Sequence, residues 1–173
     1  NWDETAAPAQ QIDSHNEVNT LPTGQQFGMT KMQHDSIFNL MIQINWPKQS
    51  RTHTWDNHGG SYPKGTCLGA TYEKGCPRLG SFTERAREVA ILINRILMTN
   101  LRGANFHWGS LQLNENIVSE EHRDKNNEGK SIIALFGNFE GGAFVCEEDH
   151  LVCSKTRLWT VIDGRKVHRS NPF

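Results

Sequence analysis

The sequence has 173 residues, a length that fits a single domain with its own core. Its formal net charge is −1, so the chain as a whole offers no electrostatic case for binding nucleic acid or an acidic membrane, although a local basic patch stays open. No apolar run approaches the roughly 20 residues needed to span a bilayer, and the first residues lack the apolar stretch of a signal peptide. We therefore expect a soluble domain, whose compartment the sequence leaves open.

The first eighty residues predict little regular structure. Residues 1–30 are rich in Gln, Asn, Thr and Pro, which is typical of an extended or disordered arm. Residues 34–47 form a short apolar segment whose periodicity does not decide between helix and strand. Residues 48–80 contain a Gly-Gly pair and two prolines, so we interpret them as long irregular loops. Residues 31–173 would then form one domain.

Residues 81–100 predict a helix. Ser81 and Glu84 match the capping box, in which each side chain satisfies a backbone donor of the first turn. Apolar residues recur at helical spacing and would form one buried stripe: Phe82, Ala86, Val89, Ala90, Ile93, Ile96 and Leu97. The arginines of this segment lie mostly off the stripe, and we expect them on a solvated face.

From residue 104 to residue 173 the pattern changes to short strands. Apolar residues alternate loosely in "NFHWGSLQLN", and the apolar runs "SIIALFGNF" and "GAFVCEE" are separated by a turn at "EGG". Two further runs flank Asp163-Gly164, a dipeptide that is typical of a two-residue hairpin. One helix followed by antiparallel strands predicts an α+β chain, mainly β, whose strands form a sandwich or barrel with the helix packed outside.

The four cysteines form two local pairs, Cys67 with Cys76 and Cys146 with Cys153. Neither pair has the Cys-x-x-Cys spacing of a zinc site. Cys146 and Cys153 flank "EEDHLV" and could face each other across a hairpin, where a disulfide would require an oxidising compartment. Two buried free thiols explain the same pattern. The sequence leaves both pairings open.

The polar stretch 114–131 contains the residues with the clearest chemical pattern. His122 and Asp124 are two positions apart, and a strand would point both side chains to one face. His168 follows Asp163-Gly164 on a strand of its own. Two histidines and one carboxylate from two strands form the facial triad that binds non-haem Fe(II) and leaves coordination positions open. A His–Asp pair in a solvated loop is the alternative explanation.

The other histidines are weaker candidates. His150 lies in a predicted hairpin loop, where a solvated side chain is expected, and His107 precedes Trp108 on a predicted strand of the core or sheet surface. His53 and His58 could bind a metal through a loop. We expect Trp108 and Trp159 to pack in the barrel rather than to stack on nucleic-acid bases.

The segments "LQLNENIVSEEHRDKNNEGKSIIALFGNFEGGAFV" and "WTVIDGRKVHRSNPF" resemble the 2-oxoglutarate- and Fe(II)-dependent dioxygenases, and more narrowly their TET/JBP-like branch. In that branch a strand leads into His-x-Asp followed by Asn, then a strand, a Gly-Gly turn, and a distal His before Pro-Phe. The likeness covers about residues 108–173. The first hundred residues are similar only through the helix that precedes the barrel.

The resemblance implies a fold, a cofactor and a reaction. The fold would be a double-stranded β-helix of the jelly-roll or cupin-like type, with at least one supporting helix. Ferrous iron would be bound by His122, Asp124 and His168, with 2-oxoglutarate as co-substrate and oxidation of a substrate C–H bond as the reaction. For the TET/JBP-like branch that substrate is a methylated nucleic-acid base, which leaves a duplex by flipping. Asn126 and Asn127 would contact the co-substrate or the substrate.

Two further positions correspond to the same motif. Asn138 stands where many relatives carry Asp, so this position is similar but not identical. Gly141 and Gly142 fit the hairpin that folds the second sheet back over the first. A plain turn explains these two glycines equally well.

The sequence departs from the family pattern at its last residues. Relatives continue after Pro-Phe with Gly-x-Arg on a further strand, and that arginine pairs with the far carboxylate of 2-oxoglutarate. This sequence stops at Phe173, so the final strand is missing or truncated. Arg165 and Arg169 are the nearest substitutes as co-substrate anchors, although alternation places Arg169 on the face opposite to His168.

Two further hypotheses keep the fold without the oxygenase activity. A barrel without its last strand has an open edge, which a protein partner could cover with a strand of its own. The chain would then be a catalytically inactive binding or structural subunit of a larger assembly. The other hypothesis is a cupin-like metal-binding protein on the same architecture.

Overall fold

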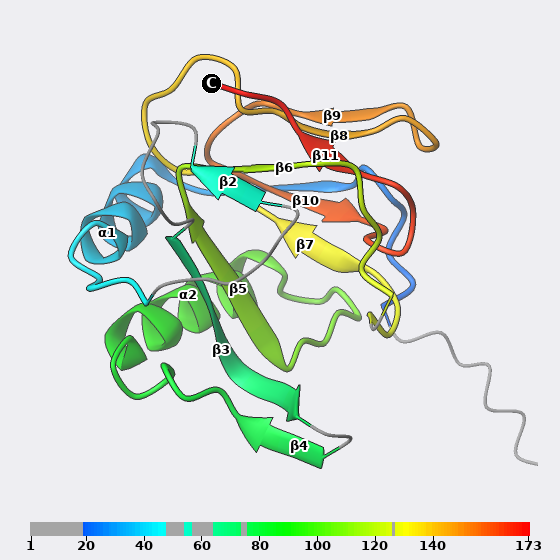
Figure 1. Cartoon of the computed structure of the whole chain (residues 1–173). Coiled ribbons are helices and arrows are strands. Elements are labelled where there is room, and N and C mark those ends of the chain that lie inside the picture. Colours follow the sequence, from blue (N-terminus) through cyan, green and yellow to red (C-terminus); the bar gives the residue numbers. More distant parts are fainter. Residues whose placement is uncertain (1–18, 48–53, 57–63, 74–75, 126) are drawn as a thin grey trace, which may run out of the picture.

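The computed structural model describes residues 19–47, 54–56, 64–73, 76–125 and 127–173. This part of the chain is mainly β, with two helices and antiparallel pairing between the named strands, as expected for an α+β chain (Figure 1). The elements in chain order are β1 (Gln26–Gly28), α1 (Lys31–Met41), β2 (Thr54–Asp56), β3 (Lys64–Glu73), β4 (Cys76–Leu79), α2 (Arg87–Asn100), β5 (Ser110–Glu115), β6 (Ile117–Ser119), β7 (Ser131–Ile133), β8 (Phe144–Cys146), β9 (Leu151–Cys153), β10 (Leu158–Ile162) and β11 (Arg169–Ser170). Neither described helix is long and apolar enough to cross a membrane.

The described strands form four small sheets. Their orders are β1-β10-β7, β11-β8-β9, β2-β6 and β4-β3-β5. Strand β10 is the centre of its sheet, because Thr160 pairs with Gln26 on one side and with Ile133 on the other. In Figure 1 the sheet containing β8, β9 and β11 lies at the opposite end of the molecule from β4.

The larger hydrophobic core joins the two helices to strands from two sheets. It contains four buried residues of α2 (Val89, Ile93, Ile96 and Leu97) together with Ile37 of α1, Leu68 of β3 and Trp159 of β10. Burial of each such side chain stabilises the fold by about 1.5–3 kcal/mol. A second cluster of Phe144, Cys146, Cys153 and Ile162 lies between β8, β9 and β10. The apolar stripe predicted on α2 is therefore confirmed at its buried positions.

The apolar segment 34–47, for which periodicity does not decide between helix and strand, begins as part of helix α1. Thr30 is its N-cap: its hydroxyl accepts from the Gln33 N–H at 3.1 Å, and the Gln33 side chain accepts from the Thr30 N–H at 3.0 Å. This reciprocal capping box satisfies two backbone donors of the first turn. Because "TKMQ" lies before the apolar segment, the prediction that began at residue 34 missed the start of the helix.

The capping box predicted at Ser81 and Glu84 is wrong, and α2 begins at Arg87 rather than at residue 81. Residues 81–86 form turns instead, in which the Phe82 carbonyl accepts hydrogen bonds from the N–H groups of Arg85 and Ala86. Strand β3 determines this geometry, because the Gly80 N–H donates to the Gly69 carbonyl and the Gly69 N–H donates to the Thr83 hydroxyl. Contact with a neighbouring strand therefore overrides the local helix signal.

The prediction of irregular loops over residues 48–80 is wrong for β2, β3 and β4. Strand β3 pairs with β5 from Lys64 to Gly69, and from Ala70 onward it pairs with β4. Gly69 lies at this change of partner with φ +89°, and a Cβ there would stand 2.5 Å from the Gly109 carbonyl oxygen. A glycine that reads as a turn signal thus permits a close approach of two strands.

The arm predicted for residues 1–30 is part of the β structure over its described portion, residues 19–30. Strand β1 pairs with β10, with Phe27 opposite Trp159. The Asn19 side chain is buried and binds the backbone of His107 and Lys130. Residues 1–18 lie outside the described part of the chain.

The hairpin predicted at Asp163-Gly164 is wrong. Both edges of β10 are already paired, with β1 and with β7, and the chain after Gly164 crosses to the other sheet, where β11 pairs with β8. The carboxylate of Asp163 stabilises the turn by accepting from the Arg165 N–H at 3.1 Å and from the Arg165 guanidinium. The Asp-Gly dipeptide therefore marks a crossover between sheets.

The Gly-Gly pair lies where the last residues return along β8. Gly141 and Gly142 have φ values of +82° and +63°, and a Cβ on Gly141 would stand 2.5 Å from the Pro172 carbonyl oxygen. The Gly142 N–H donates to the Pro172 carbonyl, and the Asn171 N–H donates to the Ala143 carbonyl. Both special φ values and close approach require glycine here, so the pair is more than a plain turn.

Segment 168–171 has neighbours on both sides. On one side it pairs with residues 143–145, and on the other the Ser170 hydroxyl accepts from the Ser119 N–H and His168 pairs with His122. Strand β11 is therefore the edge strand of its sheet, and residues 119–122 cover part of this edge.

The predicted hairpin between Cys146 and Cys153 is present as β8 and β9, with Cys146 opposite Leu151 and Cys153 opposite Phe144. All four cysteines are free thiols. Burial raises the pKa of both Cys146 and Cys153, so these two remain neutral.

Candidate metal centre

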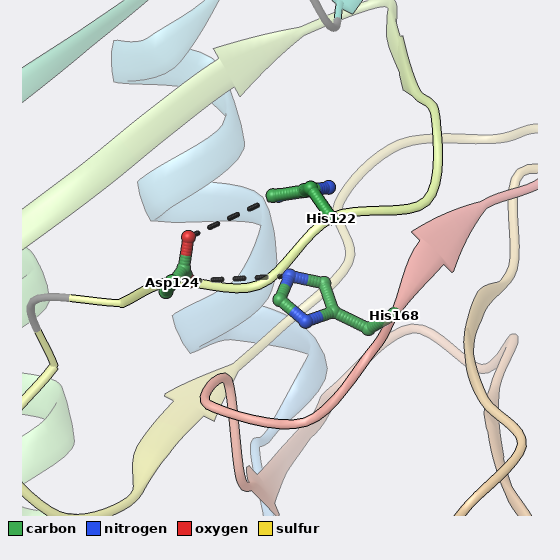
Figure 2. Close-up of side chains that lie close together, drawn as sticks. All are labelled: His122, Asp124 and His168. Atoms are coloured by element: carbon green, nitrogen blue, oxygen red, sulfur yellow. Dashed lines mark ion pairs between the residues drawn. The ribbon is translucent and has the colours of Figure 1, made fainter.

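The side chains of His122, Asp124 and His168 converge at one point. Figure 2 shows the first two extending from the segment before β7, and His168 from the segment before β11. Asp124 Oδ1 lies 3.9 Å from His122 Nε2, and Asp124 Oδ2 lies 3.9 Å from His168 Nε2. One potential ligand atom from each residue lies within 4.8 Å of the other two. A small cation between them could contact all three.

The backbone brings the two histidines together through a bridge. His122 and His168 form an antiparallel pair in which each N–H donates to the other residue's carbonyl at 3.0 Å. The ring centroids lie 4.3 Å apart. The prediction that His122 and Asp124 share one face of a regular strand is wrong, because this segment makes a single bridge and β7 begins only at Ser131. The convergence arises from the crossover after β10 instead.

The second nitrogen of each imidazole has a backbone partner. His122 Nδ1 lies 2.7 Å from the Glu120 carbonyl oxygen, and His168 Nδ1 lies 2.9 Å from the Lys166 carbonyl oxygen. A carbonyl oxygen only accepts, so Nδ1 is the protonated nitrogen in both rings. In the neutral imidazole Nε2 then carries the lone pair, and these are the nitrogens that face Asp124. Metal-binding histidines are commonly oriented in this way.

Asp124 is positioned by the turn that follows β10. Its N–H donates to the Gly164 carbonyl at 2.8 Å. The Asn127 side-chain amide lies 3.4 Å from Asp124 Oδ2 and donates to the Ser131 hydroxyl at 3.2 Å. A Cβ on Gly164 would stand 3.0 Å from Asp124 Oδ2 and 2.8 Å from Asn127 Nδ2. The absence of a side chain at position 164 therefore makes room for the carboxylate.

The group is buried on one side and open on the other. His168 is 7% exposed and packs against Phe144, with ring centroids 5.2 Å apart. The side chain of His122 is 19% exposed and that of Asp124 is 42% exposed. A bound metal would thus be accessible from the Asp124 side, where a second ligand could reach it.

The arginines expected to bind a co-substrate are each bound to carboxylates. Arg165 makes a bidentate pair with Asp163, with both contacts at 2.8 Å, and this pairing lowers the pKa of the Asp163 carboxyl. Arg169 donates to Glu147 at 3.1 Å and lies 3.8 Å from Glu121. The structure places both residues near the histidine segments, but their guanidinium groups face these acids.

The remaining candidates stand apart from the group. Asn138 is exposed, and His150 is exposed in the turn between β8 and β9 with φ +51°. His107 is exposed and contacts Asn105, while Trp108 donates to Asn94 beside the core. His53, His58 and Asn126 lie outside the described residues.

Sequence reasoning did not identify Gly164 or the acidic turn at residues 147–149 as parts of this region. The Asp-Gly dipeptide predicts a hairpin at Gly164, whereas the contact of Gly164 with Asp124 joins residues forty positions apart in the chain. The acidic turn binds Arg123, Lys166 and Arg169, and the only sequence signal for this is the opposite charge of the two groups. Nothing local to either segment indicates that they meet.

Comparison of the chain with protein-family models, curated proteins and solved structures finds no match.

Proposed function

We propose that this chain binds Fe(II) through His122 Nε2, Asp124 and His168 Nε2, and that it is a 2-oxoglutarate-dependent oxygenase. The observation that carries the proposal is the meeting of two oriented imidazole nitrogens and one carboxylate within 4.8 Å. Two histidines and a carboxylate with open positions form the donor set that is typical of non-haem Fe(II) oxygenases. The open side at Asp124 leaves access for a co-substrate.

The donor set fits a divalent cation electrostatically. A histidine that binds a metal through Nε2 must be neutral, with its proton on Nδ1, so Asp124 would be the one formal charge among the three metal-bound residues. A divalent ion would therefore retain positive charge, which favours an anionic co-substrate such as a keto acid. Bound iron would supply the oxidation of a substrate C–H bond with dioxygen.

The proposed fold of the β region is a double-stranded β-helix with the two described helices as support. The crossing of the chain from β10 in one sheet to β11 in another, close to the candidate metal centre, supports this arrangement. The likeness of residues 108–173 to TET/JBP-like dioxygenases supports a methylated nucleic-acid base as the substrate class.

Anaerobic titration with Fe(II) tests the metal site. We expect the parent to bind one equivalent, and His122→Ala, Asp124→Ala or His168→Ala to bind at least about 100-fold more weakly, because each loses a ligand. His107→Ala is the matched control, since it removes an exposed imidazole that is not part of the group. Equal Fe(II) affinity in the parent and the Asp124→Ala variant would show that the proposed metal site is incorrect.

A second experiment tests the proposed oxygenase reaction. We expect 2-oxoglutarate added to the anaerobic Fe(II) protein to produce a visible charge-transfer absorption, and dioxygen then to yield succinate. A single-stranded oligonucleotide carrying a methylated base should increase succinate formation if the substrate class is correct. The same unmethylated oligonucleotide is the control for this comparison.

One observation favours a second candidate function. Because Arg165 and Arg169 are both paired with carboxylates, neither is prepared to bind the far carboxylate of 2-oxoglutarate in this conformation. The alternative is a metal-binding relative of the same fold without oxygenase turnover. Stoichiometric metal binding, without a charge-transfer band and without succinate, would support this alternative.

A further inference from the structure

The turn between β8 and β9 carries three consecutive acidic residues, Glu147, Glu148 and Asp149. Each carboxylate binds a basic residue within two positions of a proposed metal ligand. Glu148 Oε1 accepts from Arg123 Nη2 at 3.1 Å, Glu147 Oε1 accepts from Arg169 Nη2 at 3.1 Å, and Asp149 binds the Lys166 ammonium. We call this set of three ion pairs the clasp.

The three cations of the clasp come from both ligand segments. Arg123 lies between His122 and Asp124, while Lys166 and Arg169 lie on either side of His168. A single turn therefore contacts both segments that must meet to form the metal site. The antiparallel pairing of β8 with β11 explains how this happens, because it places the turn that follows β8 beside the residues that precede His168.

Further bonds connect the clasp to the backbone of the ligand segments. Glu148 Oε1 also accepts from the Val167 N–H at 3.2 Å, directly before His168. Arg123 Nη1 donates to the Arg165 carbonyl at 3.3 Å. The Lys166 carbonyl is the partner of His168 Nδ1. Displacement of the turn would therefore move the groups that orient His168.

Asp149 is the most buried acid of the clasp. Its side chain is 12% exposed, and the Cys146 thiol lies 3.6 Å from its second oxygen. The side chains of Glu148 and Arg123 are each about half exposed, so their pair is individually weak and screened by salt. All three acids lie on the same turn between β8 and β9, so the three pairs connect one hairpin to the ligand segments.

We propose that the clasp positions the metal ligands, so that metal affinity depends on Arg123 and Glu148 although neither residue is a ligand. The proposal rests on the proposed metal site and adds a condition for its assembly. Glu147, Glu148 and Asp149 hold the His122–Asp124 segment and the His168 segment at a set separation. They also neutralise three cations that would otherwise repel a bound metal.

The Arg123→Gln substitution separates positioning from simple charge effects. Removal of a cation beside a metal site should tighten metal binding if charge alone matters. If the clasp positions the ligands, Arg123→Gln should instead weaken Co(II) or Fe(II) binding by about 10-fold, a typical cost of losing an outer-shell partner. Glu148→Gln should weaken it similarly. The double variant should lose less affinity than the product of the two single effects, because both substitutions break the same Arg123–Glu148 pair, although each also alters a bond of its own, to Arg165 or to Val167.

The control is Lys125→Gln, which removes a cation that directly follows Asp124 but lies outside the clasp. It should bind the metal at least as tightly as the parent. Binding by Arg123→Gln that equals or exceeds that of the parent, with an unchanged unfolding midpoint, would overturn the proposal.

Hydrogen exchange in the metal-free protein provides a readout that does not depend on metal binding. The amides of His122 and His168 donate to each other's carbonyls, so their exchange rates report how well the two segments are held together. We expect both amides to exchange faster in Arg123→Gln than in the parent, while amides of β3 stay unchanged. Unchanged exchange at both histidines would overturn the clasp. A parent that binds no metal would contradict only the proposed function.

Discussion

A side chain at position 164 would lie against two residues of the candidate metal centre. Gly164 has φ outside the left-handed region, so alanine can adopt its backbone conformation, and the conflict is purely steric. The methyl group would stand 2.8 Å from the Asn127 amide and 3.0 Å from the Asp124 carboxylate, both on movable side chains. The substitution should therefore displace these groups without unfolding the protein.

We predict that Gly164→Ala weakens Fe(II) binding by about 10-fold and changes the free energy of unfolding by less than about 1 kcal/mol. Isothermal titration and urea unfolding measure the two quantities. Gly28→Ala is the matched control, because a Cβ at Gly28 would have no neighbour within 4 Å. Metal affinity equal to that of the parent in Gly164→Ala would contradict the proposed position of Asp124.

The crossover between β10 and β11 depends on Asp163. Its side chain is buried, and its two oxygens are bound by the Arg165 guanidinium and the Arg165 N–H. The bonds from Arg165 are the main cause that lowers the pKa of Asp163 below its ordinary value of 3.8. A group with a lowered pKa in the folded state stabilises the protein above its unfolded pKa and loses this contribution as the pH falls.

We predict that Asp163→Asn lowers the free energy of unfolding by about 1–2 kcal/mol at neutral pH, since a charge-assisted bidentate pair is lost. The difference from the parent should stay constant above about pH 5 and shrink as the pH falls below 3.8, where Asp163 becomes protonated first in the unfolded and then in the folded state. Urea unfolding across this pH range measures it. A difference that grows on acidification would contradict the assignment.

Asn19 connects three distant parts of the chain. It is 5% exposed with φ +68°, a conformation that asparagine tolerates better than most residues. Its amide donates to the His107 carbonyl at 2.7 Å and to the Lys130 carbonyl at 3.3 Å, and its side-chain oxygen accepts from the His107 N–H. The Lys130 ammonium binds the Leu21 carbonyl in return.

We predict that Asn19→Ala lowers the free energy of unfolding by about 1–3 kcal/mol, because buried backbone groups lose their partners. Asn105→Ala is the control, since its exposed side chain contacts the exposed His107 ring and should change stability by less than about 0.5 kcal/mol. Chemical denaturation measures both variants. Equal stability of the two would show that residues 19–21 are not part of the folded unit.

Some features could be predicted from the sequence because they depend on nearby residues. The apolar stripe of α2 and the hairpin of β8 and β9 both follow from spacing over a few positions. Strand β3 could not be predicted, because its glycine and polar residues are stabilised by pairing with β5, which lies far along the chain. The prediction of where α2 begins failed for a related reason, since contacts of residues 80–83 with β3 replace the local cap.

The chemical groups of the candidate site can be identified from the sequence: two histidines and an aspartate in a pattern that is typical of a metal site, on a mainly β chain. Their arrangement in space depends on the fold. The three side chains converge because β10 has both edges paired and the chain must cross to another sheet, which brings His168 beside His122 and Gly164 beside Asp124. The fold also places three acids of one turn against three cations of two other segments. Such contacts depend on strand pairing between distant residues, and local patterns carry no information about it.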